Sequence, residues 1–282
     1  MNSKNIKRHI GAKMRDWLAT IDDENVKQII QDNAIITGGA LVSLLTGEEP
    51  HDYDVYFKTK EAVIAVAKYY VNKWNSNHKV KAEVLTVEDR VKVFIRSIGV
   101  AEEEPDKEID DPFTEDNEEA KSDTKEKYSP VFLSSNAITL SNKIQIVTRF
   151  YGDVTEIHKN YDFAHCTCSW SSWDNEVSLP VKALECIINK ELYYIGSKYP
   201  LCSIIRTRKY LERGYHINAG QYVKMAMQLN ELDLKNISVL EDQLTGVDTS
   251  YFQMMIDKLR EDYSEDGKID STYVIELVNK LF

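Results

Sequence analysis

The sequence predicts an α+β protein, in which a mixed-sheet domain is followed by an all-helical C-terminal domain. Before residue 178, short apolar runs such as NAIITGG and YDVYF alternate with segments of helical spacing such as EAVIAVAKYYVNKW. From Val181 onward, helical spacing continues almost throughout. We therefore expect a sheet-containing domain over residues 1–178 and a helical domain over residues 179–282.

The expected elements follow one another closely along the chain. In the first part they are helices over 4–19, 23–32, 40–47 and 61–74, and strands over 33–39, 53–57, 80–85, 90–98 and 137–150, the last range holding two strands joined around Ser141 and Asn142. Gly47 is expected to stop the brief helix 40–47. In the second part we expect helices over 181–196, 201–214, 217–232, 249–262 and 271–282.

One segment, residues 101–127, is too acidic to join either domain core. It holds 13 acidic and 4 basic residues, a net charge of -9, which leaves -2 of the total of -11 for the remaining chain. With few apolar residues it cannot bury enough surface to offset chain entropy, so we expect a mobile, disordered insertion. The alternative is an acidic arm that binds a basic partner. Because the remaining chain is nearly neutral, we expect no binding to long duplex DNA.

Neither a membrane span nor a secretory signal is expected. No run approaches the roughly 18 apolar residues that a transmembrane helix needs, and the N-terminus lacks a continuous apolar core. The four cysteines form no paired CxxC motif of the kind that holds structural zinc. We expect a cytoplasmic protein with reduced thiols and no membrane partner.

The informative stretch is Ile36 to Phe57, where a glycine pair precedes two spaced aspartates. Gly38 and Gly39 end a strand and open a helix, which allows a phosphate to approach backbone N–H groups. Asp52 and Asp54 are two residues apart on an apolar strand, so both carboxylates project from one face. Two such carboxylates need a cation, and hard oxygen ligands suit Mg²⁺ or Mn²⁺.

Together these features resemble the DNA polymerase beta-type nucleotidyltransferase superfamily. Twelve residues lie between Gly39 and Asp52, a spacing most similar to the tRNA CCA-adding enzymes and bacterial poly(A) polymerases. Leu44, Leu45, Gly47 and Pro50 also stand where that family tends to have similar residues. The resemblance implies a polymerase beta-like sheet domain, a bound divalent metal and an NTP substrate. In general character the chain also resembles nucleotidyltransferase-like proteins of large bacteriophages.

Weaker resemblance continues downstream and supplies further candidate residues. IQIVTR, ending at Arg149, is similar to the family strand with Thr-x-Arg, and YDFAHC around Asp162 is similar to its Arg-Arg-Asp-Phe motif. Residues 200–217 resemble the arginine-rich helix. The resemblance implies Asp52, Asp54 and Asp162 as catalytic residues, with Asp52 and Asp54 as metal ligands, and it implies nucleotide contacts from Gly38, Gly39, Lys58, Arg149, Arg206, Arg208 and Arg213. Asp162 as a structural acceptor, and the arginines as a solvated helix face, are the alternatives.

The sequence also departs from the family pattern. Val42 and Ser43 replace the arginine and aspartate that follow the glycine pair in tRNA-adding enzymes, and Asn160 and Tyr161 replace the paired arginines. Gln145 stands where the family would place a third carboxylate, so either Asp153 or Asp162 substitutes for it or the activity is reduced. Because the family's arginines and the aspartate after the glycine pair are missing, recognition of tRNA is in doubt.

Three functional hypotheses remain open at this point. The first is an enzyme that transfers a nucleoside monophosphate from an NTP to an acceptor, such as an RNA end, a protein or a small molecule, and releases pyrophosphate. The second is a nucleotide-binding module with weakened catalysis, because of Gln145 and the missing arginines. The third is an interaction protein on the same scaffold.

Overall fold

The computed structural model describes residues 2–87, 90–96, 126–244, 255, 257–259 and 271–281. These residues form two compact units. The first holds the described residues up to His158 and from His165 to Ile187, and the second holds Lys159–Ala164 and those from Ile188 onward. The expected acidic insertion, 101–127, lies outside the described residues except for Glu126 and Lys127, as does most of the helix expected over 249–262.

The first unit is built on a seven-stranded sheet with the order β5-β6-β7-β2-β1-β8-β9. Its strands are β1 (Ala34–Thr37), β2 (Tyr53–Phe57), β5 (Pro130–Leu133), β6 (Ala137–Leu140), β7 (Ile144–Tyr151), β8 (Ser169–Ser171) and β9 (Glu176–Ser178). The pair β2 and β7 is parallel, whereas the other pairs are antiparallel. The sheet is therefore mixed, as predicted. A separate antiparallel hairpin is formed by β3 (Lys81–Val87) and β4 (Arg90–Arg96).

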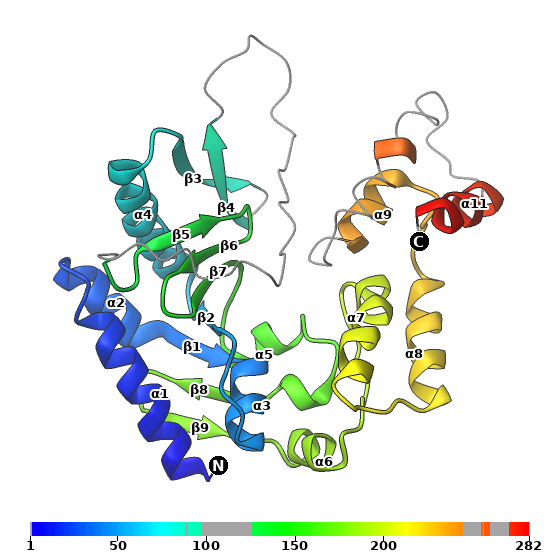
Figure 1. Cartoon of the computed structure of the whole chain (residues 1–282), viewed down its shortest axis with the longest axis horizontal. Helices are drawn as coiled ribbons and strands as arrows, with labels where there is room; N and C mark the ends of the chain where they lie inside the picture. Colours follow the sequence, from blue (N-terminus) through cyan, green and yellow to red (C-terminus); the bar gives the residue numbers. More distant parts are fainter. Residues whose placement is uncertain are drawn as a thin grey trace. The chain divides into compact units, whose positions relative to one another are not determined.

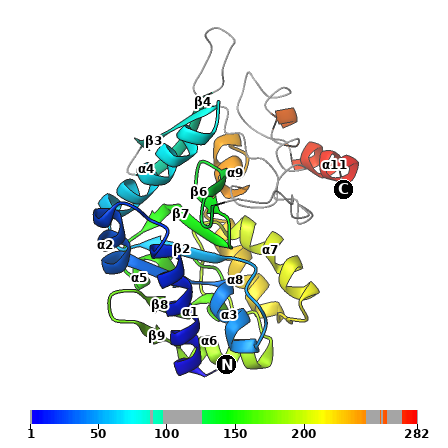
Figure 2. The ribbon, with the colours of Figure 1, turned by 60° about the vertical axis from the view of Figure 1, so that its left-hand side comes forward.

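Helices cover one face of this sheet (Figures 1 and 2). They are α1 (Ser3–Leu18), α2 (Glu24–Asn33) and α4 (Lys60–Asn77), and their buried apolar residues form one core with those of the strands. Successive side chains of a strand point to opposite faces of the sheet. Ile36, Val55 and Ile146 lie in this core. Their neighbours Asp54 and Gln145 therefore belong to the opposite face.

Local sequence signals set the ends of these helices. Asp23 caps α2 by accepting hydrogen bonds from the backbone N–H groups of Asn25 and Val26, and Thr59 caps α4 through the N–H of Ala62. The short helix α3 (Gly39–Thr46) ends at Gly47, whose φ of 85° is in the left-handed region that favours glycine. Each of these ends agrees with the sequence prediction to within a few residues.

The second unit is mainly helical, but residues 190–196 form an extended segment that the sequence analysis missed. The helices described in it include α7 (Pro200–Glu212), α8 (Ala219–Leu229), α9 (Ile237–Leu244) and α11 (Ser271–Leu281). The helix predicted over 181–196 is wrong beyond residue 189, because α6 (Val181–Asn189) stops before Lys190, whose φ is 50°. After it the chain extends and forms bridges from Glu191 to His216 and from Tyr194 to Phe163.

The predicted fold class is confirmed: a mixed-sheet α+β part is followed by a helical part. No described helix has the length and apolar character that a membrane crossing requires.

Candidate active site

The glycine pair forms a turn at the end of β1 that only glycine adopts readily. Gly38 is buried and has a φ of 86° and a ψ of -142°, a backbone region that L side chains rarely enter. Gly39 is exposed and is the first residue of α3. A Cβ added to Gly39 would meet no atom within 4 Å. Open space therefore borders the first N–H groups of α3, where an anion is favoured.

A buried hydrogen-bond chain anchors this turn through Thr37, the last residue of β1. The Thr37 hydroxyl donates to the carbonyl oxygen of Cys168 at 2.8 Å, and its oxygen lies 2.8 Å from Nε2 of His158. Burial lowers the pKa of His158 to about 4. Because the ring is neutral at pH 7 and the single Thr37 proton is already donated, Nε2 carries a proton and donates to Thr37.

The two aspartates flank Tyr53 at the beginning of β2. Asp54 lies in the strand and Asp52 directly precedes it. The Tyr53 N–H donates to the carbonyl oxygen of Lys143 at 2.8 Å, and the buried Tyr53 hydroxyl lies 2.7 Å from Nε2 of His9. Burial, with a smaller contribution from Glu49, raises the pKa of Tyr53 to about 12. Since Tyr53 points into the core, alternation directs Asp54 to the other face.

Lys143 clamps the loop that leads to Asp52, a contact that the sequence analysis missed. Its ammonium donates to Oε1 of Glu49 at 2.6 Å and to the carbonyl oxygen of Pro50 at 3.2 Å. Together with the bond from Tyr53, these contacts hold the backbone on both sides of Asp52. Lys143 has a φ of 62° in the tight turn between β6 and β7, and the Ser-Asn-Lys turn was its only signal in the sequence.

The sheet register brings these parts to one end of the sheet. Ile36 on β1 pairs with Val55 on antiparallel β2, so the glycine turn leaves β1 next to where β2 begins. Asp54 pairs with Gln145 on β7, and because these strands are parallel, β7 begins at the same end. The turn, Asp54 and Gln145 therefore converge at one edge of the sheet.

Two carboxylates and one amide are the side-chain donors that the sequence and register place near this end of the sheet. Within the described part of the chain, no group of three or more His, Cys, Asp or Glu residues is placed to hold a metal. Mg²⁺ is commonly bound by one or two carboxylates, with substrate phosphates and water completing its coordination. Asp52 and Asp54 are carboxylates of this kind, and Gln145 carries an amide where a third carboxylate would stand.

The other candidates of the first unit lie further along the chain than the two aspartates. Lys58 comes after β2, Arg149 is in β7 beyond Gln145, and Asp153 follows β7. Lys58 follows the far end of β2, where its ammonium lies 4.0 Å from the centroid of the Trp173 ring. At about 3.3 Å per residue it is roughly 13 Å along the strand from Asp54. Arg149 lies further along β7, with its guanidinium 5.4 Å from the Phe150 ring. Asp153, a suggested third carboxylate, is exposed and accepts from the N–H of Glu156.

The remaining candidates belong to the second unit. Asp162 is 5% exposed, and its Oδ2 accepts a hydrogen bond from Nη1 of Arg206 at 3.0 Å. Arg208 is exposed and bonds to Glu212 one turn further along α7. Arg213 is exposed at the end of the same helix. Asp162 and Arg206 thus form an ion pair in this unit, and the arginines do not share one set of contacts.

Comparison with solved structures returns enzymes that process tRNA. A tRNA-processing enzyme with CTP is 13% identical, with 91% of this chain and 56% of that chain covered and a TM-score of 0.42. A Thermotoga maritima CCA-adding enzyme complexed with tRNA is 9% identical, with 94% and 59% covered and a TM-score of 0.40. A Bacillus stearothermophilus CCA-adding enzyme in complex with CTP is 13% identical, with 84% and 50% covered and a TM-score of 0.37. Similarity at these levels assigns no activity to the chain.

Comparison by sequence gives a more specific result. A curated protein of Bacillus phage SPbetaL7, Gabija anti-defense 2, is 21% identical over 275 residues, which cover 94% of this chain and 56% of that protein. The chain therefore spans little more than half the length of this relative. The family model described as Gabija anti-defense 2 family protein matches residues 9–190, well over half of the chain. The chain belongs to the Gabija anti-defense 2 family.

Proposed function

We propose that the chain is a metal-dependent nucleotidyltransferase, which transfers a nucleoside monophosphate from an NTP to an acceptor and releases pyrophosphate. The observation that carries this proposal is the convergence of the glycine turn, Asp52 and Asp54 at one edge of the sheet. The motif spacing that resembles the polymerase beta superfamily supports it. Membership of the polymerase beta superfamily and a domain boundary near residue 178 are also part of the proposal.

Each part of the site has a distinct task in this reaction. The N–H groups at the start of α3 hold the phosphates, and Gly39 leaves room for them because it lacks a side chain. Asp52 and Asp54 hold Mg²⁺ or Mn²⁺, which when bound neutralises phosphate charge and activates the acceptor hydroxyl. Thr37 fixes the glycine turn, and Lys143 fixes the loop before Asp52. The protein thus contributes mainly alignment and electrostatics.

The family name gives this activity a biological setting. We propose that the chain is encoded by a phage and acts in the host cytoplasm against the Gabija defence named in its family and in its relative. The acceptor is then a component of that defence, either a protein, an RNA end or a small molecule. A covalently added nucleotide inactivates such a component, and one copy of the chain can modify many copies of its target without remaining bound to them.

Transfer of label tests this proposal directly. The chain is incubated with each of four NTPs labelled at the α-phosphate, Mg²⁺ and purified Gabija components or RNA. Label that becomes covalently attached to one acceptor, and that is absent with Asp54→Asn, is the expected result. Label that stays in free nucleotide with every acceptor would contradict the proposal.

A weakened nucleotide-binding module is the second candidate, and Gln145 beside Asp54 is the observation that favours it. A neutral amide cannot hold a second metal ion as a carboxylate does. This candidate predicts that NTP raises the melting temperature without any pyrophosphate release. Turnover at ordinary enzyme rates, about 1 s⁻¹ or more, would exclude it.

A further inference from the structure

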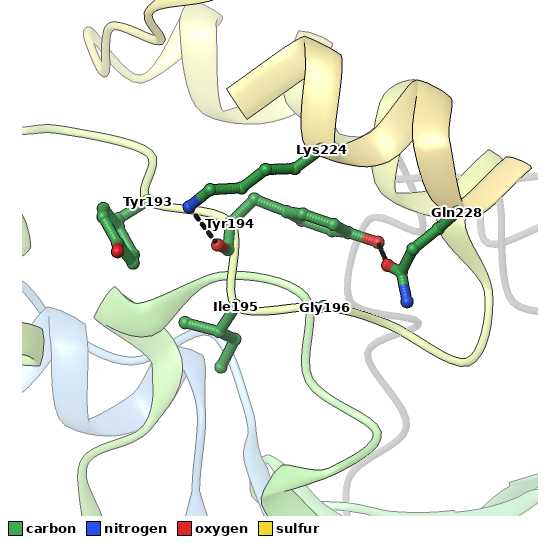
Figure 3. Close-up of a pocket in the computed structure, with 6 residues that line it drawn as sticks. All are labelled: Tyr193, Tyr194, Ile195, Gly196, Lys224 and Gln228. Atoms are coloured by element: carbon green, nitrogen blue, oxygen red, sulfur yellow. Dashed lines mark hydrogen bonds between the residues drawn. The ribbon is translucent and has the colours of Figure 1, made fainter. Parts of the chain in front are cut away.

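A pocket of about 430 Å³ lies wholly within the second unit (Figure 3). One side is the extended segment after α6, with Tyr193, Tyr194, Ile195 and Gly196, and the other is α8, with Lys224 and Gln228. None of these lining residues takes part in the site at the edge of the sheet.

Two hydrogen-bond acceptors of the pocket lining, the Gln228 amide oxygen and the Tyr194 carbonyl oxygen, are already used by the protein. Oε1 of Gln228 accepts from the Tyr194 hydroxyl at 2.5 Å and from the N–H of Ser197 at 3.2 Å. The carbonyl oxygen of Tyr194 accepts from the ammonium of Lys224 at 3.2 Å (Figure 3). These two oxygens are therefore not open to a ligand.

The orientation of the Gln228 amide follows from these bonds. The N–H of Ser197 can only donate, so the amide oxygen and not its nitrogen must face it. Burial raises the pKa of Tyr194 to about 12, so its hydroxyl keeps its proton at neutral pH. Nε2 of Gln228 consequently offers its two N–H groups elsewhere, and no described residue accepts a hydrogen bond from them.

Lys224 adds a positive charge that the pocket lining does not neutralise. Its ammonium lies 4.0 Å from the centroid of the Tyr193 ring and also donates to Oε1 of Gln221 at 3.1 Å. Three uncharged groups thus hold the ammonium in place, and of the six described residues that line the pocket none is acidic. Fixed donors and a fixed cation select an anionic ligand that is rich in acceptor oxygens.

We propose that this pocket binds a nucleotide, with the phosphate group at Lys224. The Lys224 ammonium supplies the charge for the phosphate, and the Gln228 amide, at the other end of the Tyr194 side chain, donates hydrogen bonds to the sugar or base. The Tyr193 ring and the exposed Ile195 side chain also contact the sugar or base. Gly196 has no side chain to cover the Gln228 amide, which leaves it open to the ligand. This site is additional to the carboxylates of β2 and does not depend on them.

Methyl NMR of the full chain tests this binding. The Ile δ1 methyl groups are ¹³C-labelled in an Asp52→Asn/Asp54→Asn background with EDTA, so that the proposed metal site contributes nothing. The Ile195 signal is assigned with Ile195→Val. AMP, inorganic phosphate, adenosine and acetate are then titrated at constant ionic strength.

We expect AMP and inorganic phosphate to shift the Ile195 signal to saturation, and adenosine and acetate to bind about tenfold more weakly or not at all. Tighter binding of the dinucleotide pApA than of AMP would identify an RNA chain as the phosphate source, and equal binding would identify a single nucleotide. No shift with AMP, or equal affinity for AMP and adenosine, would overturn the proposal.

Gln228→Glu is the decisive variant, because it keeps the acceptor oxygen for Tyr194 and Ser197 while replacing the free donor with negative charge. We expect it to weaken AMP binding about tenfold or more, whereas Lys209→Met, which removes an exposed charge on α7, leaves affinity unchanged. Lys224→Gln, which keeps an amide donor for Tyr194, should give the same loss if Gln228→Glu does not fold. Unchanged AMP affinity in a folded variant of either kind would refute the assignment.

Discussion

Asp54 on β2 and Gln145 on β7 are register partners on neighbouring parallel strands. Their side chains therefore share one face of the sheet, with Thr139 of β6 as the next partner of Gln145. A carboxylate at position 145 would stand beside Asp54, so the identity of this residue sets the negative charge available at the edge of the sheet.

Gln145→Glu should lower the Mg²⁺ concentration needed for half-maximal pyrophosphate release by about tenfold, equivalent to ~1.4 kcal/mol. An added carboxylate provides the charge that binds a cation. In EDTA the same variant should melt at a lower temperature than wild type, because two like charges then lie side by side. Gln145→Met is the uncharged control, and an identical Mg²⁺ requirement for Gln145→Glu and wild type would argue against the placement of the metal.

Substitution by alanine should lower stability at Gly38 and weaken NTP binding at Gly39. Gly38→Ala is expected to destabilise the fold by about 2 kcal/mol, because its φ of 86° is strained for an L residue. Gly39→Ala should leave stability unchanged, since its Cβ has open space, but it should weaken NTP binding by filling the approach to α3. Urea unfolding and NTP titration separate the two effects, and full NTP affinity in Gly39→Ala would contradict the phosphate position.

Lys143→Met should reduce turnover about tenfold at limiting Mg²⁺, because the loop before Asp52 loses its contacts to Glu49 and Pro50. The ion pair is exposed, so the cost in stability should stay below about 1 kcal/mol. Lys143→Arg keeps the donors and should restore most of the activity. A Lys143→Met protein with wild-type kinetics across the Mg²⁺ range would show that the clamp does not position Asp52.

His158 should make the stability of the first unit depend on pH. Its pKa is about 4 in the folded chain and near 6.5 when unfolded, so between these values the unfolded state binds the extra proton. The contribution of His158 to the free energy of unfolding is therefore fully present above pH 6.5, and it is lost as the pH falls towards 4. From pH 7 to pH 5 we expect a loss on the order of 1–2 kcal/mol in urea unfolding. His158→Gln keeps a donor for Thr37 and should flatten this dependence; an equal loss in both proteins would exclude His158 as its source.

Much of the first unit could be predicted because its signals are local. The alternation in Tyr53–Phe57 indicates a strand, and Asp23, Thr59 and Gly47 mark helix ends through contacts within a few residues. The predicted turn around Asn142 is confirmed for the same reason. Such elements depend little on the rest of the chain.

The parts that were missed depend on distant residues. Asp162 and Arg206 are 44 residues apart in sequence, and their ion pair follows from packing of the second unit. Likewise, Lys190 ends α6 at a positive φ, and the segment after it is extended because His216 and Phe163 pair with it. Apolar periodicity in residues 181–196 favoured a continuous helix, and the tertiary pairing overrides it.

The most direct test of the central claim is Mg²⁺-dependent pyrophosphate release by the wild-type chain and by Asp52→Asn/Asp54→Asn, with each NTP and the Gabija components as acceptors. Asp32→Asn is the matched control, because Asp32 is exposed and, among the described residues, its carboxylate accepts hydrogen bonds only from the amide of Gln28. We predict release by wild type and by Asp32→Asn, and a loss of at least a hundredfold, ~2.7 kcal/mol, in the double variant. Equal release by the double variant and wild type would show that Asp52 and Asp54 are not the metal-binding carboxylates.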